Sequence, residues 1–331
     1  MTENGTLYLT MGDPAGIGPE ITLKALAALS QERRAKVIVI GTRSVLDATQ
    51  QAIGTALTIE DAGSSGDGSL RLIDIDMEGL DFAPGELAAA NGEASFRYIE
   101  RAVREAQAAT GPSCIVTAPI NKEALNLAGH HYDGHTGLLA HLTGCTSSWM
   151  MLTSQDLTVV HVSTHVSLHD AVERATTNRV LETIRITDKH LRRLHGGQPR
   201  IAVSGINPHC GENGLFGTED DTRLKPAVDA ARQEGINVTG PVSGDSVYRQ
   251  AATGEFDAVI AQYHDQGHIP MKMIAFDTAV NVTLGLPIDR TSVDHGTAYG
   301  IAGKNLADYT NMACAIAEAE LLIERPYKGA K

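Results

Sequence analysis

Three histidines stand shortly after apolar segments of the kind that form buried strands: His165, His209 and His264. The carboxyl ends of parallel strands meet at one edge of a sheet, so the loops that carry these side chains would lie together. Three imidazoles with an open position suit Zn²⁺ or another divalent metal ion. The spacing is long, however, and it fits three separate structural histidines equally well. The pattern therefore leaves a metal site and a structural role as open alternatives.

A second group of side chains can bind an anion. Arg offers a planar fork for carboxylate or phosphate, and Lys offers a point charge. The group consists of Lys272, Asn281, Arg290, His135 and Thr136. The alternative is that its charged members are solvated surface residues, with Asp289 as a simple ion-pair partner of Arg290. The first interpretation predicts a small, negatively charged substrate.

Strands and helices alternate along the chain. Apolar segments predict strands at residues 7–11, 36–41, 70–75, 113–119, 149–153, 157–162, 200–203 and 257–262. Apolar periodicity predicts helices at residues 20–28, 91–109, 175–194 and 224–235. This alternation favours an α/β fold with a largely parallel sheet. We interpret residues 263–272 as a charged loop after the last of these strands, where α/β proteins often hold their chemistry.

A glycine-rich segment at residues 12–18 lies between the first strand and the first helix. It matches neither the G-x-G-x-x-G dinucleotide fingerprint nor the G-x-x-x-x-G-K-[ST] phosphate loop. We interpret it as a tight strand-to-helix turn that needs glycine dihedral angles. Pro19 suits the first position of the helix that follows, and Glu20 suits its positive start.

The composition limits the classes of function. The chain has 331 residues, of which 42% are hydrophobic and 20% charged, and a net charge of −13. This balance excludes a general binder of nucleic-acid phosphates. No run of about 18 apolar residues predicts a membrane span, and residues 1–5 lack the pattern of a signal peptide. The four cysteines lie far apart and form no C-x-x-C pair. We expect a cytoplasmic protein without nucleic-acid or membrane partners.

Seven motifs together resemble the 4-hydroxythreonine-4-phosphate dehydrogenase family, and the resemblance covers nearly the whole chain. The motifs are MGDPAGIGPE at residues 11–20, TAPINK at 117–122, GHT at 134–136, STH at 163–165, NPH at 207–209, YHDQG at 263–267 and RTSVDHGTA at 290–298. The resemblance implies an α/β fold like that of isocitrate and isopropylmalate dehydrogenases, with two α/β/α domains and largely parallel sheets.

The same resemblance implies a domain division and an assembly. The first domain would comprise residues 1–125 and 275–331, and the second would comprise residues 126–274. The protein would form a homodimer whose active site lies near the interface between the subunits.

The resemblance also implies roles for individual residues. By position, the metal ligands would be His165, His209 and His264, and the substrate contacts would be His135, Thr136, Lys272, Asn281 and Arg290. His295 and Gly296 lie in a stretch that resembles the cofactor loop of the wider β-decarboxylating dehydrogenase group. Lys122 and Asp265 are both candidates for the general base, and the choice between them is open. The implied cofactors are NAD, with NADP left open, and a divalent cation such as Zn²⁺, Mg²⁺, Mn²⁺ or Co²⁺.

Three stretches, residues 120–125, 160–165 and 267–272, are most similar to the catabolic branch of the family. That branch implies oxidative decarboxylation of 4-phospho-D-threonate or 4-phospho-D-erythronate to dihydroxyacetone phosphate, CO₂ and NADH. The alternative substrate is 4-phosphohydroxy-L-threonine, from the synthesis of pyridoxal phosphate. Rival hypotheses from other classes are a metal-dependent phosphatase and a non-catalytic sensor of sugar-acid phosphates.

Two positions depart from the family pattern. The family usually has Glu after the His-Thr pair, whereas this chain has Gly137. The loss of that carboxylate would alter the rigidity of the loop, the choice of partner or the activity. Asp289 also places a negative charge beside Arg290, where relatives tend to carry an uncharged residue.

Overall fold

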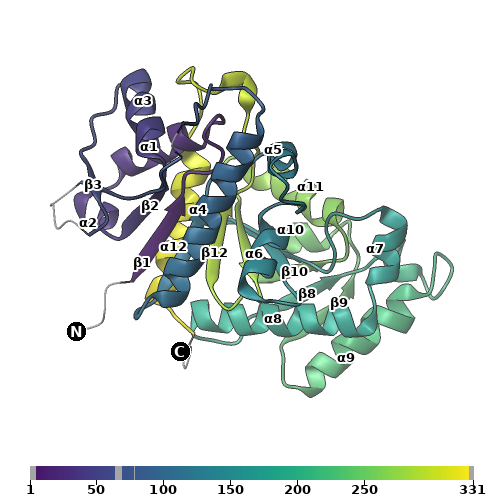
Figure 1. Ribbon diagram of the computed structural model, residues 1–331. Helices are drawn as coiled ribbons and strands as arrows, with labels where there is room; N and C mark the ends of the chain where they lie inside the picture. The colour runs from purple at the N-terminus through teal and green to yellow at the C-terminus, as the bar shows by residue number, and fades with distance from the viewer. Residues whose placement is uncertain (1–4, 64–68, 78, 328–331) are drawn as a thin grey trace. The chain divides into compact units, whose positions relative to one another are not determined.

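The computed structural model describes residues 5–63, 69–77 and 79–327 (Figure 1). Its contacts divide the chain into two compact units, Met1–Ser148 with Leu286–Pro326 (unit 1) and Trp149–Gly285 with Tyr327–Lys331 (unit 2). This division places residues 126–148 in unit 1, whereas we expected them in the second domain. It places residues 275–285 in unit 2, whereas we expected them in the first domain. The arrangement is an α/β fold with mostly parallel strands, as the alternation of the sequence predicts.

Within its described residues, unit 1 has six strands that all pair in parallel, in the spatial order β3-β4-β2-β1-β5-β12. They are β1 (Thr6–Thr10), β2 (Val37–Gly41), β3 (Ile59–Asp61), β4 (Leu70–Asp74), β5 (Ser113–Thr117) and β12 (Asp289–Val293). The helices of unit 1 are α1 (Gly18–Ala28), α2 (Gln31–Arg34), α3 (Arg43–Ile53), α4 (Ala89–Ala108), α5 (Lys122–Leu127), α6 (His135–Thr143), the short η3 (Tyr299–Ile301) and α12 (Thr310–Glu324). Helix α4 packs on β1, β2 and β5, and α12 packs on β5 and β12.

The described part of unit 2 also has six strands, in the order β11-β6-β7-β10-β8-β9. The pairs β11/β6 and β6/β7 are antiparallel, and the others are parallel. The strands are β6 (Trp149–Thr153), β7 (Thr158–His161), β8 (Ile201–Ser204), β9 (Val238–Val242), β10 (Ala258–Ala261) and β11 (Val280–Leu284). The helices are α7 (Leu168–Arg174), α8 (Thr177–His195), η1 (Pro208–Gly211), η2 (Asp220–Leu224), α9 (Lys225–Gln233), α10 (Val247–Ala252) and α11 (His264–Ala275).

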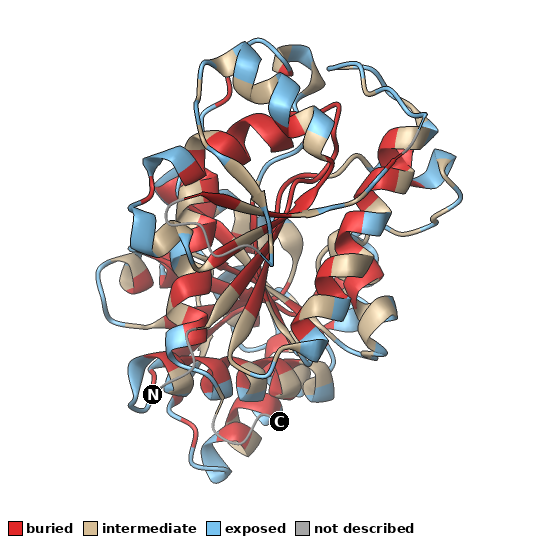
Figure 2. Cartoon of the chain, turned by 60° about the vertical axis from the view of Figure 1, so that its left-hand side comes forward, coloured by how far each residue is buried: buried red, intermediate tan, exposed pale blue. Residues whose placement is uncertain are grey.

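Burial explains why these segments form strands and helices. In each unit most strand residues are buried, and the helices turn one face toward the strands and the other toward solvent (Figure 2). Local signals also fix where helices begin and end. In α8 the Thr176 hydroxyl accepts from the Arg179 N–H at the start, and Gly196, with a φ of 70°, ends the helix. Among the described residues, no helix is long and apolar enough to cross a membrane.

The structure contradicts the prediction of a charged loop at residues 263–272, because α11 begins at His264. Gly267 and Pro270 are poor helix formers, but tertiary hydrogen bonds outweigh that preference. The Gln266 side chain accepts from the Gln262 N–H at 2.7 Å and donates to the Gly205 carbonyl at 2.7 Å. These bonds fasten the first turn of α11 to the end of β8, so the helix starts at a fixed place.

A buried histidine in α8 makes the stability of the fold depend on pH. His190 is buried, and burial, with the charges of Arg193 and His195, lowers its pKa to about 3. Its neutral form therefore stabilises the fold above pH 6.5, and this contribution is lost as the pH falls toward 3. We expect His190 alone to lower the unfolding free energy by about 2 kcal/mol between about pH 7 and pH 5. Urea unfolding of the wild type and of His190→Phe at both pH values measures this; an equal pH dependence in the two proteins would contradict it.

Candidate functional site

The three predicted metal ligands follow three neighbouring parallel strands of unit 2. Strands β7, β10 and β8 lie side by side in that order, and His165, His264 and His209 come after their respective carboxyl ends. The edge of the sheet therefore carries all three histidines, as the strand pattern predicts.

Two of these histidines come close together. The ring centroids of His165 and His264 lie 5.6 Å apart. The His264 Nδ1–H donates to Asp265 Oδ1 at 2.6 Å, and a carboxylate commonly orients a metal-binding imidazole in this way because it leaves Nε2 free. Among the described residues, however, no group of three or more His, Cys, Asp or Glu side chains is arranged to hold a metal ion. Unit 2 thus supplies suitable donors but not a complete set.

His209 lies in a backbone conformation that side-chain-bearing residues rarely adopt. Its φ is 50°, and the next residue, Cys210, has a φ of 54°. The buried Asp220 fastens this loop, because its carboxylate accepts hydrogen bonds from the N–H groups of Ile206 and Asn207 at 2.9 and 3.0 Å. Backbone strain of this kind is often kept where it positions a functional side chain.

A cavity of about 500 Å³ in unit 2 opens beside His209. Its walls come from the turn after β8, the segment 243–248 and the first half of α11, and they include Asn207, His209, Asp245, Tyr263, Asp265 and Gln266. A cavity of this size holds a small polar metabolite. Asp265, a candidate base, and His209, a candidate metal ligand, thus line one cavity.

Two further predicted substrate contacts lie in unit 2. Lys272 is on α11, where its Nζ lies 5.2 Å from the centre of the Phe276 ring. Asn281 is on β11, and its Oδ1 is buried without a hydrogen-bond partner among the described residues. A buried amide oxygen normally finds a donor, so Asn281 is poised to accept one from a ligand.

The remaining predicted anion contacts gather in unit 1. Arg290, on β12, is 2% exposed, and its Nε and Nη2 donate to Thr117 Oγ1 at 3.2 and 2.6 Å. Burial lowers the pKa of Arg290 to about 9, so the guanidinium stays charged at neutral pH. Burial and the positive charges of Arg290 and Lys122 hold the pKa of His135 well below its usual value. His135 is therefore neutral between two cations.

The Nε2 atom of His135 is a further feature of this group of predicted anion contacts. It is buried and has no hydrogen-bond partner among the described residues. Lys122 approaches from α5, where its Cε lies 3.3 Å from the place of a side chain on Gly134, and Thr136 follows His135 in the first turn of α6. The positive charges of Arg290 and Lys122, which both act on His135, suit a phosphate or carboxylate.

The space beside Gly137 is filled by another residue. A Cβ atom on Gly137 would lie 2.3 Å from Oδ1 of Asp133, the residue before the turn into α6. The carboxylate of Asp133 thus stands where a side chain at position 137 would begin. The acidic group that this chain lacks at position 137 is present four residues earlier.

The predicted cofactor residues follow the carboxyl end of β12. His295 and Gly296 are exposed, whereas the next residue, Thr297, is buried and accepts from the Ile17 N–H at 3.0 Å. Tyr299 donates to Asp13 Oδ2 at 2.6 Å. The loop therefore rests on the glycine-rich segment, which packs so closely that a Cβ on Gly18 would lie 2.2 Å from the Met11 carbonyl oxygen. This explains the need for glycine in that turn.

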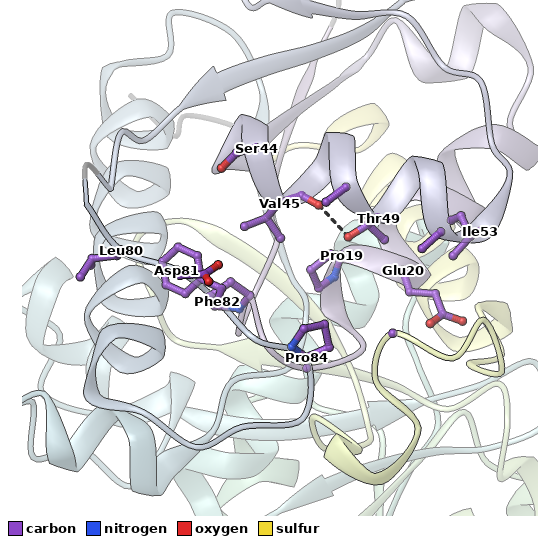
Figure 3. Close-up of a pocket in the computed structure, with 15 residues that line it drawn as sticks. Pro19, Glu20, Ser44, Val45, Thr49, Ile53, Leu80, Asp81, Phe82 and Pro84 are labelled. Carbon is purple, nitrogen blue, oxygen red and sulfur yellow. Dashed lines mark hydrogen bonds between the residues drawn. The ribbon is translucent and has the colours of Figure 1, made fainter.

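A second cavity, of about 270 Å³, lies in unit 1 between α1, α3 and the segment 80–84 (Figure 3). Figure 3 shows its mostly apolar walls, with Val45, Phe82 and Pro84 among them and Glu20 at one end. Glu20 Oε1 accepts from Lys24 and from the Ala307 N–H, at 2.8 Å each. The cavity includes none of the residues predicted to bind metal, substrate or cofactor.

Two further histidines lie beside the predicted ligands, and neither was among the predicted site residues. His161 ends β7, and His268 lies one helical turn after His264; the rings of His264 and His268 stack with centroids 3.6 Å apart. The spacing of four residues on α11 would have signalled this contact, but only once the segment is known to be helical.

Comparison with known proteins shows the class and the family. A D-threonate 4-phosphate dehydrogenase from Cupriavidus necator is 44% identical over 96% of this chain and 97% of its own. A 4-hydroxythreonine-4-phosphate dehydrogenase from Geobacter metallireducens is 45% identical over 94% and 93%. The crystal structure of a 4-hydroxythreonine-4-phosphate dehydrogenase from Klebsiella pneumoniae matches with a TM-score of 0.87 and 44% identity, over 98% of this chain and 99% of that one.

These relatives, with the fold and the sites above, identify the protein as an enzyme of the oxidoreductase class. The family model described as pyridoxal phosphate biosynthetic protein PdxA matches residues 33–319. The chain belongs to this family.

Proposed function

We propose that the protein catalyses the NAD-dependent and divalent-metal-dependent oxidative decarboxylation of 4-phospho-D-threonate or 4-phospho-D-erythronate. The observation that carries the phosphorylated substrate is the buried Arg290, whose positive charge, with that of Lys122, lowers the pKa of His135. The substrate class is supported by relatives named for D-threonate 4-phosphate. We infer a two-domain arrangement like that of isocitrate dehydrogenase, which the division into two units supports.

The proposed reaction removes a hydride and a carboxylate. The carbon that bears the 3-hydroxyl gives its hydride to NAD, and the hydroxyl proton passes to a base. The resulting 3-oxo acid loses CO₂, and a proton returns to the remaining carbon to give dihydroxyacetone phosphate. When bound, a divalent metal would acidify the hydroxyl and polarise the new carbonyl group. Arg290, His135, Thr136, Lys272 and Asn281 would bind the phosphate and the carboxylate and so orient the reacting carbon.

The contacts of Asp265 bear on the choice of base. Its carboxylate accepts from the His264 Nδ1–H at 2.6 Å, so it is engaged in orienting a candidate metal ligand. Lys122 lies in unit 1, where its positive charge, with that of Arg290, lowers the pKa of His135. We therefore propose that Asp265 orients His264 and that Lys122 handles the substrate proton. His295 and Gly296 would bind NAD from the exposed loop after β12.

A second copy of the chain would complete the metal site. The described residues of one chain hold no group of three ligands, and α11, which carries His264, exposes large apolar residues together with its C-cap residue Phe276. Ile269, Met273 and Phe276 are 60%, 82% and 69% exposed, and their spacing places them on one helical face. Such a patch is typical of an interface. We propose a homodimer in which this face of α11 is covered.

A spectrophotometric panel tests the proposal. The purified protein is assayed with 4-phospho-D-threonate, 4-phospho-D-erythronate and 4-phosphohydroxy-L-threonine, with NAD or NADP, and with Mg²⁺, Mn²⁺, Co²⁺ or Zn²⁺. We expect NADH and dihydroxyacetone phosphate from a phosphorylated sugar acid, and a dimer by sedimentation velocity. Preference for 4-phosphohydroxy-L-threonine would support the second candidate, which the name of the Geobacter relative favours. Release of inorganic phosphate without NADH would favour a phosphatase, and thermal stabilisation without turnover would favour a sensor.

A further inference from the structure

A chain of contacts leads from the interior of unit 2 to His264. His161 is 1% exposed at the end of β7, and its Nδ1 lies 3.2 Å from the Met150 carbonyl oxygen. Its other nitrogen, Nε2, lies 3.2 Å from Nδ1 of His268. The same Nδ1 atom of His268 lies 3.1 Å from the His264 carbonyl oxygen. The two histidines thus connect the core of unit 2 to the first turn of α11.

The direction of each hydrogen bond follows from its neighbours. The His161 ring is buried at the end of β7, and in its neutral form it carries one N–H. The Met150 carbonyl can only accept, so this N–H is at Nδ1 and Nε2 of His161 is an acceptor. The hydrogen between the rings must then belong to His268 Nδ1, which donates both to His161 and to the His264 carbonyl. One tautomer of His268 satisfies both of these partners.

The ring of His268 also fixes the plane of His264. The two rings are nearly parallel, at 11°, with centroids 3.6 Å apart. Asp265 holds the Nδ1 edge of His264 from another side. The ring of His264 is therefore held by one face and one edge, and Nε2 is the nitrogen that remains for a metal ion.

Gly267 is the residue that permits this contact. A Cβ atom at position 267 would lie 2.3 Å from His161 Nε2 and 2.8 Å from Val159 Cγ1. Any side chain would push α11 away from β7 and break the contact between His161 and His268. The glycine between the two helical histidines thus serves the close approach of the helix to the strand.

We propose that His161 and His268 are positioning residues that hold the His264 ring for metal binding. This inference rests on the proposed metal-dependent function. Partners of metal ligands typically change metal affinity by about 10- to 100-fold when they are replaced. His161 and His268 act through His264 and need no contact with the substrate.

The test measures metal affinity directly, by competition for Zn²⁺ with a chelating dye, and the absorption spectrum of the Co²⁺-loaded protein. His268→Phe keeps a stacked ring without the N–H, and His268→Asn keeps an N–H donor without the ring. We expect each to weaken Zn²⁺ binding by about 10-fold and to alter the Co²⁺ spectrum. His190→Phe is the matched control, because it replaces a buried histidine of unit 2 that makes none of these contacts.

A double variant guards against misfolding. His268→Phe leaves His161 Nε2 buried and unpaired, whereas His161→Leu with His268→Leu removes both partners together, which costs the fold far less. We expect the double variant to fold, with Zn²⁺ affinity about 100-fold lower. Affinities and spectra equal to those of His190→Phe would overturn the positioning role and leave the proposed function intact. A wild-type protein that binds no divalent metal would overturn both.

Discussion

Replacing Arg290 with Met is expected to lower kcat/KM for the phosphorylated substrate by about 100-fold or more, because charged hydrogen bonds contribute about 1.5–3 kcal/mol each. Arg290 is the most deeply buried cation among the predicted anion contacts, and its positive charge lowers the pKa of His135. Arg290→Lys keeps the charge but loses the planar fork, so its kcat/KM should lie between those of the wild type and Arg290→Met. Initial rates over a range of substrate concentrations measure both variants.

Although Arg290→Met should lose activity, its stability should stay the same or rise. Burying the charged guanidinium of Arg290, which is 2% exposed, costs the fold desolvation free energy, and the same burial lowers the pKa of Arg290. An apolar residue of similar length removes that burden, so the melting temperature of Arg290→Met should match or exceed that of the wild type. Arg71→Met is the control, because Arg71 is a partly buried arginine of unit 1 whose pKa burial also lowers, but it lies on β4 and is not a predicted anion contact. An inactive and unfolded Arg290→Met protein would instead assign Arg290 a structural role.

Removing the imidazole of His209 should abolish metal-dependent turnover and leave a folded protein. His209 lines the cavity of unit 2 and follows the strand next to the one that leads to His264. His209→Ala isolates the loss of the ring. His209→Gly also relieves a φ of 50°, a conformation that costs other residues about 1–2 kcal/mol. We therefore expect His209→Gly to be inactive and at least as stable as His209→Ala.

Metal content, initial rates and thermal melts decide this second prediction. His169→Ala serves as the control, since His169 is an exposed histidine of unit 2 on α7. Full activity of His209→Ala would remove His209 from the metal site. A His209→Gly protein that is clearly less stable than His209→Ala would show that the backbone of this loop is not strained.

The sequence was sufficient to predict the alternation of strands and helices and the place of the three histidines. Both follow from local pattern, because apolar segments mark β7, β8 and β10 and polar loops mark their ends. Strands β11 and β12 were not predicted. They hold Asn281 and Arg290. Strand β11 (Val-Asn-Val-Thr-Leu) does alternate apolar and polar residues, so its pattern could have been recognised, whereas β12 (Asp-Arg-Thr-Ser-Val) is too polar to show that alternation.

Other features depend on tertiary contacts that no local pattern contains. Helix α11 forms around Gly267 and Pro270 because Gln266 fastens it to β8. The contact between His161 and His268 joins residues 107 positions apart and depends on how closely that helix approaches β7. The unpaired nitrogen of His135 likewise results from packing, since its sequence neighbours do not determine its burial.

The close approach of Asp133 to Gly137 makes these two positions interdependent. A side chain at 137 and the present carboxylate of Asp133 compete for one volume, since a Cβ atom would lie 2.3 Å from Oδ1. Because Asp133 is exposed and its side chain can turn away, the two substitutions should be non-additive: the effect of Gly137→Glu depends on which residue stands at 133. A measurement of Gly137→Glu must therefore also vary position 133, so that the two positions are exchanged as a pair.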